Sequence, residues 1–400
     1  MKRNVIAYVE PSHWLGHGDT QQELYVKELL AMGQRVLVLT IFPQNTERWA
    51  AGLSAEEGSR LFIYKLKPNE GTWRNKLTKA LCWPWTAGQI RLAEKASSWK
   101  VDVVLLAWFD GMTGLWQKLL APPCLFFTYP WAGLYFIPSH LREDVPMSRR
   151  RRSRRRLLDY LAIHGGRCRG IGVLDEGVRA GLEKIGADTE VLPEVTEKDV
   201  VLSKEAEKIS KLAGGRCIFA LVGHLSPRKN LLMFLRMAKE FDENKAFFVL
   251  AGKLDLSAFR SEEQEEIKKL LAPSGRGNYY YKLEEVEDPA EFNGFLACAD
   301  VVFLVYRNFY HSSGLLAKAA FFGKPVLAAK GYCIGGRVER YGLGLTVESD
   351  NYEEILAAAK KMADEDFRRQ LVQYACFKEY DRQNSHEALR EALVRLLGLA

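Results

Sequence analysis

Short apolar runs alternate with longer amphipathic stretches along most of the chain. Apolar runs of roughly four to eight residues are typical of strands buried on both faces, and the longer stretches between them are typical of helices. The predicted strands cover residues 4–9, 35–40, 61–64, 101–108, 124–128, 170–174 and 190–193 in the first half. In the second half they cover residues 216–222, 246–252, 279–281, 301–306, 326–329 and 345–347. This alternation predicts an α/β protein with parallel sheets.

The alternation is interrupted once, by a polar and then charged stretch that ends in two glycines. A chain of 400 residues is long enough for two domains. We expect two doubly wound, Rossmann-like domains whose strands end at a shared cleft, because ligands bind outside the carboxyl ends of such strands. The expected boundaries are an N-terminal domain over 1–195, a linker over 196–215, a C-terminal domain over 216–378 and a C-terminal helix over 379–400 that could pack back on the N-terminal domain.

Two loops in the second half carry residues that suit a phosphate group. The first loop follows the strand predicted over 216–222 and contains Gly223, His224 and Lys229. The second places Ser312, Ser313 and Gly314 at the predicted start of a helix. Small residues, hydroxyls and the positive end of a helix dipole favour an anion, and a basic side chain adds charge. An ordinary strand–helix connection with solvated basic residues is the alternative.

The same two loops resemble a known family. The run from Gly223 to Asn230, with Ser313–Gly314–Leu315 and the run from Gly323 to Val326, is similar to the C-terminal half of GT-B glycosyltransferases, in particular the group-1 (family 4) retaining type. The order of elements matches over nearly the whole chain. The resemblance implies sugar transfer from a nucleotide-diphosphate donor, bound mainly by the second half, to an acceptor bound mainly by the first. It implies neither a metal nor a further cofactor, and its phosphate-binding basic pair falls on His224 and Lys229. Together with the small residues of the two loops, the expected donor-phosphate residues are Gly223, His224, Lys229, Ser312, Ser313 and Gly314.

The sequence departs from the family pattern at three of its positions. His224 stands where the family usually has an arginine, so a fixed charge is replaced by one that depends on pH. Tyr310 and Lys318 stand where the family has two glutamates, the second of which binds the donor ribose. A lysine cannot accept the hydrogen bonds of a ribose. A catalytically silent GT-B binding or scaffold protein is therefore one alternative function, and a sugar-nucleotide epimerase is another.

The first half supplies candidates for the acceptor side. Gly16, His17 and Gly18 lie in the loop after the first predicted strand, which lacks the third glycine of a dinucleotide fingerprint. Asp110 follows the strand predicted over 101–108, and by position it and His17 are candidate catalytic bases. Helix capping by Asp110 and a loop hydrogen bond by His17 are the structural alternatives. Trp131 belongs to an aromatic loop that could stack on a sugar ring or simply pack.

The formal net charge of +7 has a local origin, because residues 149–156 contain seven arginines. This block, Arg149–Arg156, predicts a helix with a densely basic first part. The block has three alternative interpretations: it could bind an anionic membrane surface, it could be plain surface or ligand charge, or it could bind nucleic acid. Nucleic acid is disfavoured, because no recognisable nucleic-acid-binding motif accompanies the block.

The cysteines and the chain start indicate the compartment. The seven cysteines are scattered and form no CxxC pair, which suggests neither a disulfide framework nor a zinc site. The first residues lack the apolar core of a signal peptide. We therefore expect a cytoplasmic protein, with peripheral attachment to the inner face of the membrane if the arginine block binds lipid.

Overall fold

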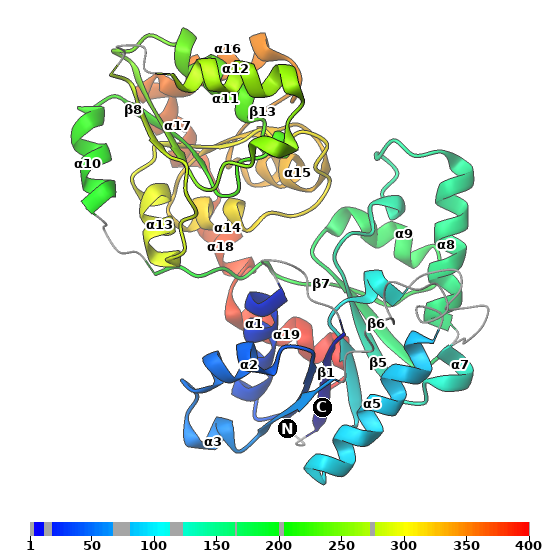
Figure 1. Cartoon of the computed structure of the whole chain (residues 1–400). Helices are drawn as coiled ribbons and strands as arrows, with labels where there is room; N and C mark the ends of the chain where they lie inside the picture. The colour runs from blue at the N-terminus through cyan, green and yellow to red at the C-terminus, as the bar shows by residue number, and fades with distance from the viewer. Residues whose placement is uncertain are drawn as a thin grey trace. The chain divides into compact units, whose positions relative to one another are not determined.

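The structure is a computed structural model that describes residues 4–11, 18–66, 81–112, 123–164, 166–199, 204–272 and 277–399 (Figure 1). The chain divides into two compact units. Unit 1 comprises Met1–Pro193 and His386–Ala400, and unit 2 comprises Glu194–Ser385. The chain therefore leaves unit 1 once and returns to it for its last helix.

Unit 1 is built on a seven-stranded parallel sheet in the order β3-β2-β1-β4-β5-β6-β7. Its strands are β1 (Val5–Glu10), β2 (Arg35–Thr40), β3 (Leu61–Lys65), β4 (Val103–Leu106), β5 (Trp131–Tyr135), β6 (Cys168–Val173) and β7 (Thr189–Val191). The helices described in this unit are α1 (Gly18–Ala31), α2 (Pro43–Ala50), α3 (Ala55–Gly58), α5 (Cys82–Ser97), α7 (Pro123–Phe126), α8 (Arg149–His164), α9 (Arg179–Glu183) and α19 (His386–Leu397). The predicted parallel α/β arrangement is confirmed for this half.

The prediction of a strand over residues 124–128 is wrong. The short helix α7 covers the beginning of that segment, and the fifth strand, β5, lies in the stretch predicted to be an aromatic loop. Every residue of β5 is buried. Gly133 lies inside β5. A glycine is needed at this position because a β-carbon would come within 3.0 Å of the Phe109 side chain. A glycine that looked like a loop signal is thus a site of close packing.

Unit 2 is built on a six-stranded parallel sheet in the order β10-β9-β8-β11-β12-β13. Its strands are β8 (Cys217–Val222), β9 (Ala246–Ala251), β10 (Tyr279–Lys282), β11 (Val301–Leu304), β12 (Val326–Ala329) and β13 (Gly344–Val347). Its described helices are α10 (Lys204–Ala213), α11 (Leu231–Glu240), α12 (Ser261–Leu271), α13 (Pro289–Ala297), α14 (Gly314–Phe321), α15 (Tyr332–Tyr341), α16 (Tyr352–Ala363), α17 (Glu365–Tyr374) and α18 (Phe377–Gln383).

Both faces of this second sheet are apolar, as its continuous apolar strands predicted. Ala220 and Val222 of β8 belong to the core on one face, and Phe219 and Leu221 belong to the core on the other. Side chains alternate along a strand, so a strand buried on both sides must be apolar throughout. Helices cover both faces, which makes unit 2 a doubly wound domain.

Half of the stretch expected to be a linker, residues 196–215, belongs to helix α10. α10 occupies Lys204–Ala213, and its Ala206, Ile209 and Ala213 are buried. Ile209 and Ala213 belong to the apolar core of unit 2. The amphipathic pattern of α10 therefore reflects packing on unit 2.

The last helix, α19, belongs to unit 1, whereas α18 belongs to unit 2. In Figure 1 the red α19 lies beside the blue α1, far from it in sequence. Two polar contacts join them: His386 Nδ1 lies 2.7 Å from Glu28 Oε1, and Arg390 Nε donates to Glu28 Oε2 at 2.5 Å. Leu389 and Leu393 are buried on the inner face of α19. The C-terminal segment thus completes the core of unit 1.

Candidate functional site

The topology of unit 2 places the two predicted phosphate loops next to each other. β8 and β11 are neighbours in the sheet, with Val301 paired to Phe219, and the chain continues outward from β8 to β9 on the other side. This reversal of strand order is a topological switch point, where the loops after the two central strands diverge. The backbone N–H of Arg307 donates to the carbonyl of Arg228 at 2.8 Å, which ties the two loops together. Both loops therefore leave the same edge of the sheet.

Gly223 shapes the first loop. It has φ +100°, in the region that favours glycine, and a β-carbon on it would come within 2.8 Å of Lys229 Nζ. The space left by the missing side chain is therefore filled by the ammonium group of the same loop. Lys229 Nζ also donates a hydrogen bond to the carbonyl of Val222, the last residue of β8. The lysine thus reaches back to the end of the strand on which the loop is built.

Lys229 is an unusual lysine because its side chain is buried, with 4% of the residue exposed. Burial, together with the neighbouring charge of Arg228, lowers the pKa of Lys229 to about 7. The ring of Tyr306 lies 5.3 Å from both cationic groups. No carboxylate among the described residues forms an ion pair with Lys229. Because the buried amine of Lys229 has no acidic partner, an incoming anion would strongly stabilise its charged form.

The second loop ends where α14 begins, as the sequence predicted. Ser313 is the residue before the helix, and no side chain caps the first turn. Gly314, the first helical residue, has Thr196 against it, since a β-carbon there would lie 3.1 Å from Thr196 Cγ2. The Thr196 hydroxyl is buried and has no hydrogen-bond partner in the described part of the chain. The start of α14 thus offers uncapped N–H groups and an unused hydroxyl.

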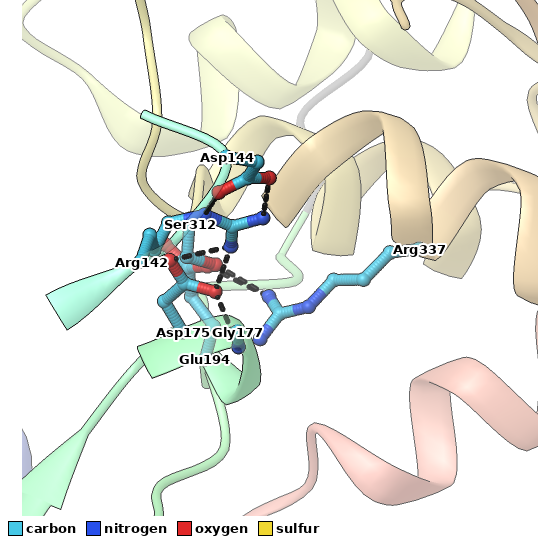
Figure 2. A network of polar contacts seen from close by, with 7 residues as sticks. All are labelled: Arg142, Asp144, Asp175, Gly177, Glu194, Ser312 and Arg337. Atoms are coloured by element: carbon cyan, nitrogen blue, oxygen red, sulfur yellow. Dashed lines mark hydrogen bonds and ion pairs between the residues drawn. The ribbon is translucent and has the colours of Figure 1, made fainter. Parts of the chain in front are cut away.

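Sequence reasoning missed the polar network around Ser312. The hydroxyl of Ser312 donates to Glu194 Oε2, and Arg337 Nη1 of α15 donates to the same hydroxyl at 2.5 Å (Figure 2). Arg337 Nη1 lies 3.7 Å from Glu194 Oε2, and both side chains are largely buried. Ser312 is 118 residues from Glu194 and 25 residues from Arg337 in the sequence, so no local pattern could have indicated the network.

His224, Tyr310 and Lys318, which stand at the three positions that depart from the family pattern, have different surroundings. The His224 side chain is exposed, with Nε2 3.9 Å from Asp255 Oδ2. Lys318 donates to Asn293 Oδ1 at 2.7 Å and to the carbonyl of Glu197 at 3.0 Å. Tyr310 packs edge-on against Tyr332. Lys318 is therefore committed to neighbouring groups of its own unit, so it does not occupy the site as a free cation.

In unit 1, Asp110 lies directly beyond β4, in a short turn of helix at Phe109–Met112. Its two carboxylate oxygens accept hydrogen bonds from the backbone N–H groups of Phe136 at 2.9 Å and Ile137 at 2.8 Å. Burial is the main reason why its pKa is raised to about 6, although the two N–H donors act in the opposite direction. Asp110 therefore fixes the end of β5 to the end of β4, a stronger structural role than helix capping.

The other first-half candidates are resolved in part. Gly16 and His17 lie outside the described residues, and Gly18 is the first residue of α1. The interpretation of Trp131 as an accessible acceptor-loop residue is wrong. Trp131 is completely buried in β5, stacked on Phe109 with ring centroids 5.4 Å apart and packed against Trp83 at 5.2 Å. A ring without exposed surface cannot stack on a sugar.

The arginine block forms the first half of helix α8, as predicted. Arg152 and Arg156 donate to backbone carbonyls of Val145 and Leu141, at 2.6 and 3.5 Å. The remaining five arginines are exposed and form no ion pair with any described residue: Arg149, Arg150, Arg151, Arg154 and Arg155. Leu157, Tyr160 and Leu161 continue this exposed surface along the helix. We call the five arginines and these three residues the α8 surface.

The inner side of α8 is anchored by a buried polar cluster. Asp159 accepts from the Tyr135 hydroxyl at 3.3 Å and lies 2.6 Å from His140 Nε2. All three residues are buried. A second cluster of unit 1, also drawn in Figure 2, holds Arg142 between Asp175 at 2.7 Å and Asp144 at 2.6 Å. These contacts fix α8 and the segment before it on unit 1.

No family model matches the chain, and no curated protein matches it in sequence. Solved structures do match over nearly its whole length. Sucrose-phosphate synthase from Thermosynechococcus elongatus superposes with a TM-score of 0.67 at 16% identity, covering 98% of both chains. HepE from Anabaena, solved with UDP and glucose, gives 0.63 at 14% identity over 100% of both. The glycosyltransferase WaaG, involved in lipopolysaccharide biosynthesis, gives 0.61 at 12% identity, over 99% of this chain and 100% of WaaG.

The chain has the GT-B fold. The predicted fold class of two doubly wound α/β domains is thereby confirmed. At these identities the likeness concerns the fold and does not select one activity. A putative UDP-N-acetylglucosamine 2-epimerase from Listeria monocytogenes also matches, with a TM-score of 0.54 at 14% identity over 95% of both chains. Within the described residues, no helix has both the length and the apolar character needed to cross a membrane.

Proposed function

We propose that this GT-B protein is a glycosyltransferase that transfers a sugar from a nucleotide-diphosphate donor to a polysaccharide, a lipid-linked glycan or another cell-surface glycan, with retention of configuration. The observation that carries the proposal is Lys229. A buried lysine whose pKa is lowered to about 7 lies at the switch point of unit 2, where a doubly wound sheet binds its ligand. A diphosphate would supply the negative charge that this amine lacks.

The donor half of the reaction follows from the same loops. As the bond between the sugar and the diphosphate breaks, negative charge grows on the leaving phosphate oxygens. In the proposed complex Lys229 and the N–H groups at the start of α14 face these oxygens, and His224 adds charge when it is protonated. Groups fixed before the reaction stabilise developing charge without a reorganisation cost, which is often the largest catalytic contribution.

The acceptor half is assigned to unit 1. The acceptor hydroxyl must lose a proton as it bonds to the sugar, and the sequence offered Asp110 and His17 as candidate bases. Asp110 holds two backbone N–H groups with its carboxylate oxygens. We therefore propose that Asp110 acts mainly by positioning the segment after β5, and His17 stays the candidate for the proton.

Two alternatives have specific support. Lys318 stands where the resembled family binds the ribose, and its ammonium is already used by Asn293 and Glu197, which favours a silent binding or scaffold protein. The epimerase match favours a sugar-nucleotide epimerase. The three functions differ in what they do to a nucleotide sugar, so one set of assays separates them.

The test is a panel of nucleotide sugars, screened first by thermal shift and then for turnover. A ligand that binds only the folded state at 100 times its dissociation constant adds roughly 2.7 kcal/mol to the stability. A transferase stabilised by its donor should release the nucleoside diphosphate, and faster when acceptor is present. Stabilisation without turnover would leave the scaffold function, and turnover of the donor to an epimer without acceptor would favour the epimerase. Absence of binding at millimolar concentration would contradict the transferase and the epimerase and would leave the scaffold function.

We further propose that the α8 surface docks the protein on an anionic membrane, as a peripheral protein of the cytoplasmic face that works on a lipid-linked acceptor. Basic residues near an anionic bilayer contribute roughly 1 kcal/mol each. Five unpaired arginines beside exposed Leu157, Tyr160 and Leu161 combine this attraction with apolar side chains that can enter the headgroup region. We propose no nucleic-acid partner for this surface.

Co-sedimentation with phosphatidylglycerol-containing vesicles tests the docking. The variant replaces the five exposed arginines of the α8 surface with glutamine and should lose vesicle binding. The matched control removes the same charge from unit 2 through five exposed lysines, Lys204, Lys208, Lys211, Lys360 and Lys361, and should keep it. Equal loss in both variants would mean that net charge alone is responsible. Binding by wild type that is the same on neutral vesicles would contradict the proposed docking.

A further inference from the structure

The start of α14 already has a carboxylate beside it. Glu194 accepts a hydrogen bond from Ser312 through Oε2, and Arg337 bridges the two, as Figure 2 shows. Its other oxygen, Oε1, lies 3.7 Å from the position of a β-carbon on Gly314, the first residue of the helix. Glu194 therefore sits where the uncapped N–H groups and the positive end of the α14 dipole favour a negative group.

Glu194 is held in this place by its backbone. Its N–H donates to Asn384 Oδ1 at 2.9 Å, and Asn384 Nδ2 donates to the carbonyl of Tyr380 at 2.8 Å. Asn384 is buried directly after α18, and α18 packs on α14. All of these residues belong to unit 2. The backbone of Glu194 is thus anchored beside the helix start by contacts within unit 2, while its side chain can change partners.

The partners of Glu194 are the ones that a phosphate group uses. A serine hydroxyl, an arginine guanidinium and a helix N-terminus can each bind either a carboxylate or a phosphate oxygen. Arg337 has 8% of its side chain exposed and Glu194 has 15%, so water does little to screen the charges. The Glu194 charge also adds to the rise in the pKa of the buried Tyr306, the ring that lies over Arg228 and Lys229. The 3.7 Å approach of Oε1 to the β-carbon position of Gly314 places Glu194 at the edge of the same site.

We propose that Glu194 is a built-in competitor of the donor diphosphate: its carboxylate fills the anion position at the start of α14 in the empty protein and must yield Ser312 and Arg337 when the diphosphate binds. This inference rests on the proposed donor site. Two negative groups cannot share one set of donors without repulsion, so the presence of Glu194 lowers donor affinity. Release of the leaving diphosphate is helped by the same carboxylate when it returns to its partners.

The opposite role is a positioning one. Glu194 could hold Arg337 in the orientation that a diphosphate needs, in which case its charge would increase donor affinity. The variant Glu194→Gln separates the two roles, because glutamine keeps the size of the side chain and an oxygen acceptor for Ser312 but carries no charge. Glu207→Gln is the matched control, since Glu207 is an exposed carboxylate of α10 in the same unit.

The experiment measures the dissociation constants of UDP and of inorganic pyrophosphate by isothermal titration calorimetry on the full chain. We expect Glu194→Gln to bind both ligands roughly ten-fold more tightly than wild type, and Glu207→Gln to match wild type. Arg337→Gln should weaken binding more in the Glu194→Gln background than in wild type, because in wild type the ligand gains Arg337 only by displacing it from the Glu194 carboxylate, which reduces the net gain. The double variant also avoids leaving a buried carboxylate without its arginine.

The outcomes separate this inference from the proposed function. Binding of UDP by wild type with equal or weaker binding by Glu194→Gln would overturn the competitor role and leave the donor site intact. Failure of wild type and Glu194→Gln alike to bind either ligand would overturn both. Binding by Glu194→Gln alone would support both, with the competitor dominant in wild type. A change in Glu207→Gln equal to that in Glu194→Gln would also overturn the inference, because the effect would then come from net charge.

Discussion

The buried Lys229 makes donor binding depend on pH in a way that can be calculated. With a pKa of about 7 in the free protein, Lys229 is protonated in about nine of ten molecules at pH 6 and in about one of ten at pH 8. A bound diphosphate favours the charged amine and raises the pKa of Lys229 in the complex. Binding above pH 7 must therefore include the uptake of a proton.

The magnitude follows from this linkage. Each pH unit above the free pKa costs about 1.4 kcal/mol of binding free energy, or about ten-fold in affinity, as long as the pH stays below the pKa in the complex. We expect the affinity for a UDP-sugar to fall roughly 100-fold between pH 6 and pH 9. A UDP-sugar is the suitable ligand because both of its phosphates are esterified and do not titrate in this range.

The assay is calorimetry at pH 8 in buffers of different ionisation enthalpy, which gives the number of protons taken up on binding. Wild type should take up nearly one proton. Lys229→Gln should bind more weakly at pH 6 and show no proton uptake at pH 8 from this position. His224→Gln is the control for the second titratable group of the loop and should keep most of the uptake. The assigned role of Lys229 would be refuted if the affinity of wild type stayed constant from pH 6 to pH 9 and equalled the affinity of Lys229→Gln.

Three further predictions concern the residues that shape the two units. Gly223→Ala should lower the unfolding free energy by roughly 1–3 kcal/mol in denaturant titration and abolish proton uptake, because φ is +100° and the new β-carbon would displace Lys229 Nζ. For Asp110 the folded chain keeps a proton that the unfolded chain loses between pH 3.8 and about 6, so stability falls as pH rises through that window. Asp110→Asn should flatten this part of the stability profile; an unchanged slope would exclude Asp110 as its source. Trp131→Ala should cost roughly 3–5 kcal/mol of unfolding free energy while the folded fraction keeps its UDP affinity, and loss of affinity without loss of stability would restore a ligand role.

The sequence predicted the features that depend on local pattern. The apolar strands and the helix start at Gly314 both follow from residues close in the chain. The sequence placed the loops containing Gly223 and Gly314 after two strands of the same half, and the strand order of the structure makes these strands neighbours.

What the sequence could not predict depends on distant contacts. β5 looked like a loop because it contains Gly133 and follows Pro130, but the glycine is needed where the Phe109 ring approaches the strand. Burial of Lys229 required the space at Gly223 and the ring of Tyr306, which a local interpretation as a solvated loop lysine does not include. Glu194 looked like one more polar residue of the link between two domains.

The two loops of unit 2 are proposed to bind the donor diphosphate. A crystal structure of the protein grown with a UDP-sugar tests this proposal most directly. We predict density for the diphosphate between the loop that contains Gly223 and the first turn of α14, within hydrogen-bonding distance of Lys229 Nζ and with the Glu194 carboxylate moved away from Ser312. A nucleotide bound elsewhere on the protein would contradict this proposal. So would a crystal grown at a saturating concentration of the UDP-sugar in which this site holds no ligand and Glu194 keeps its contact with Ser312.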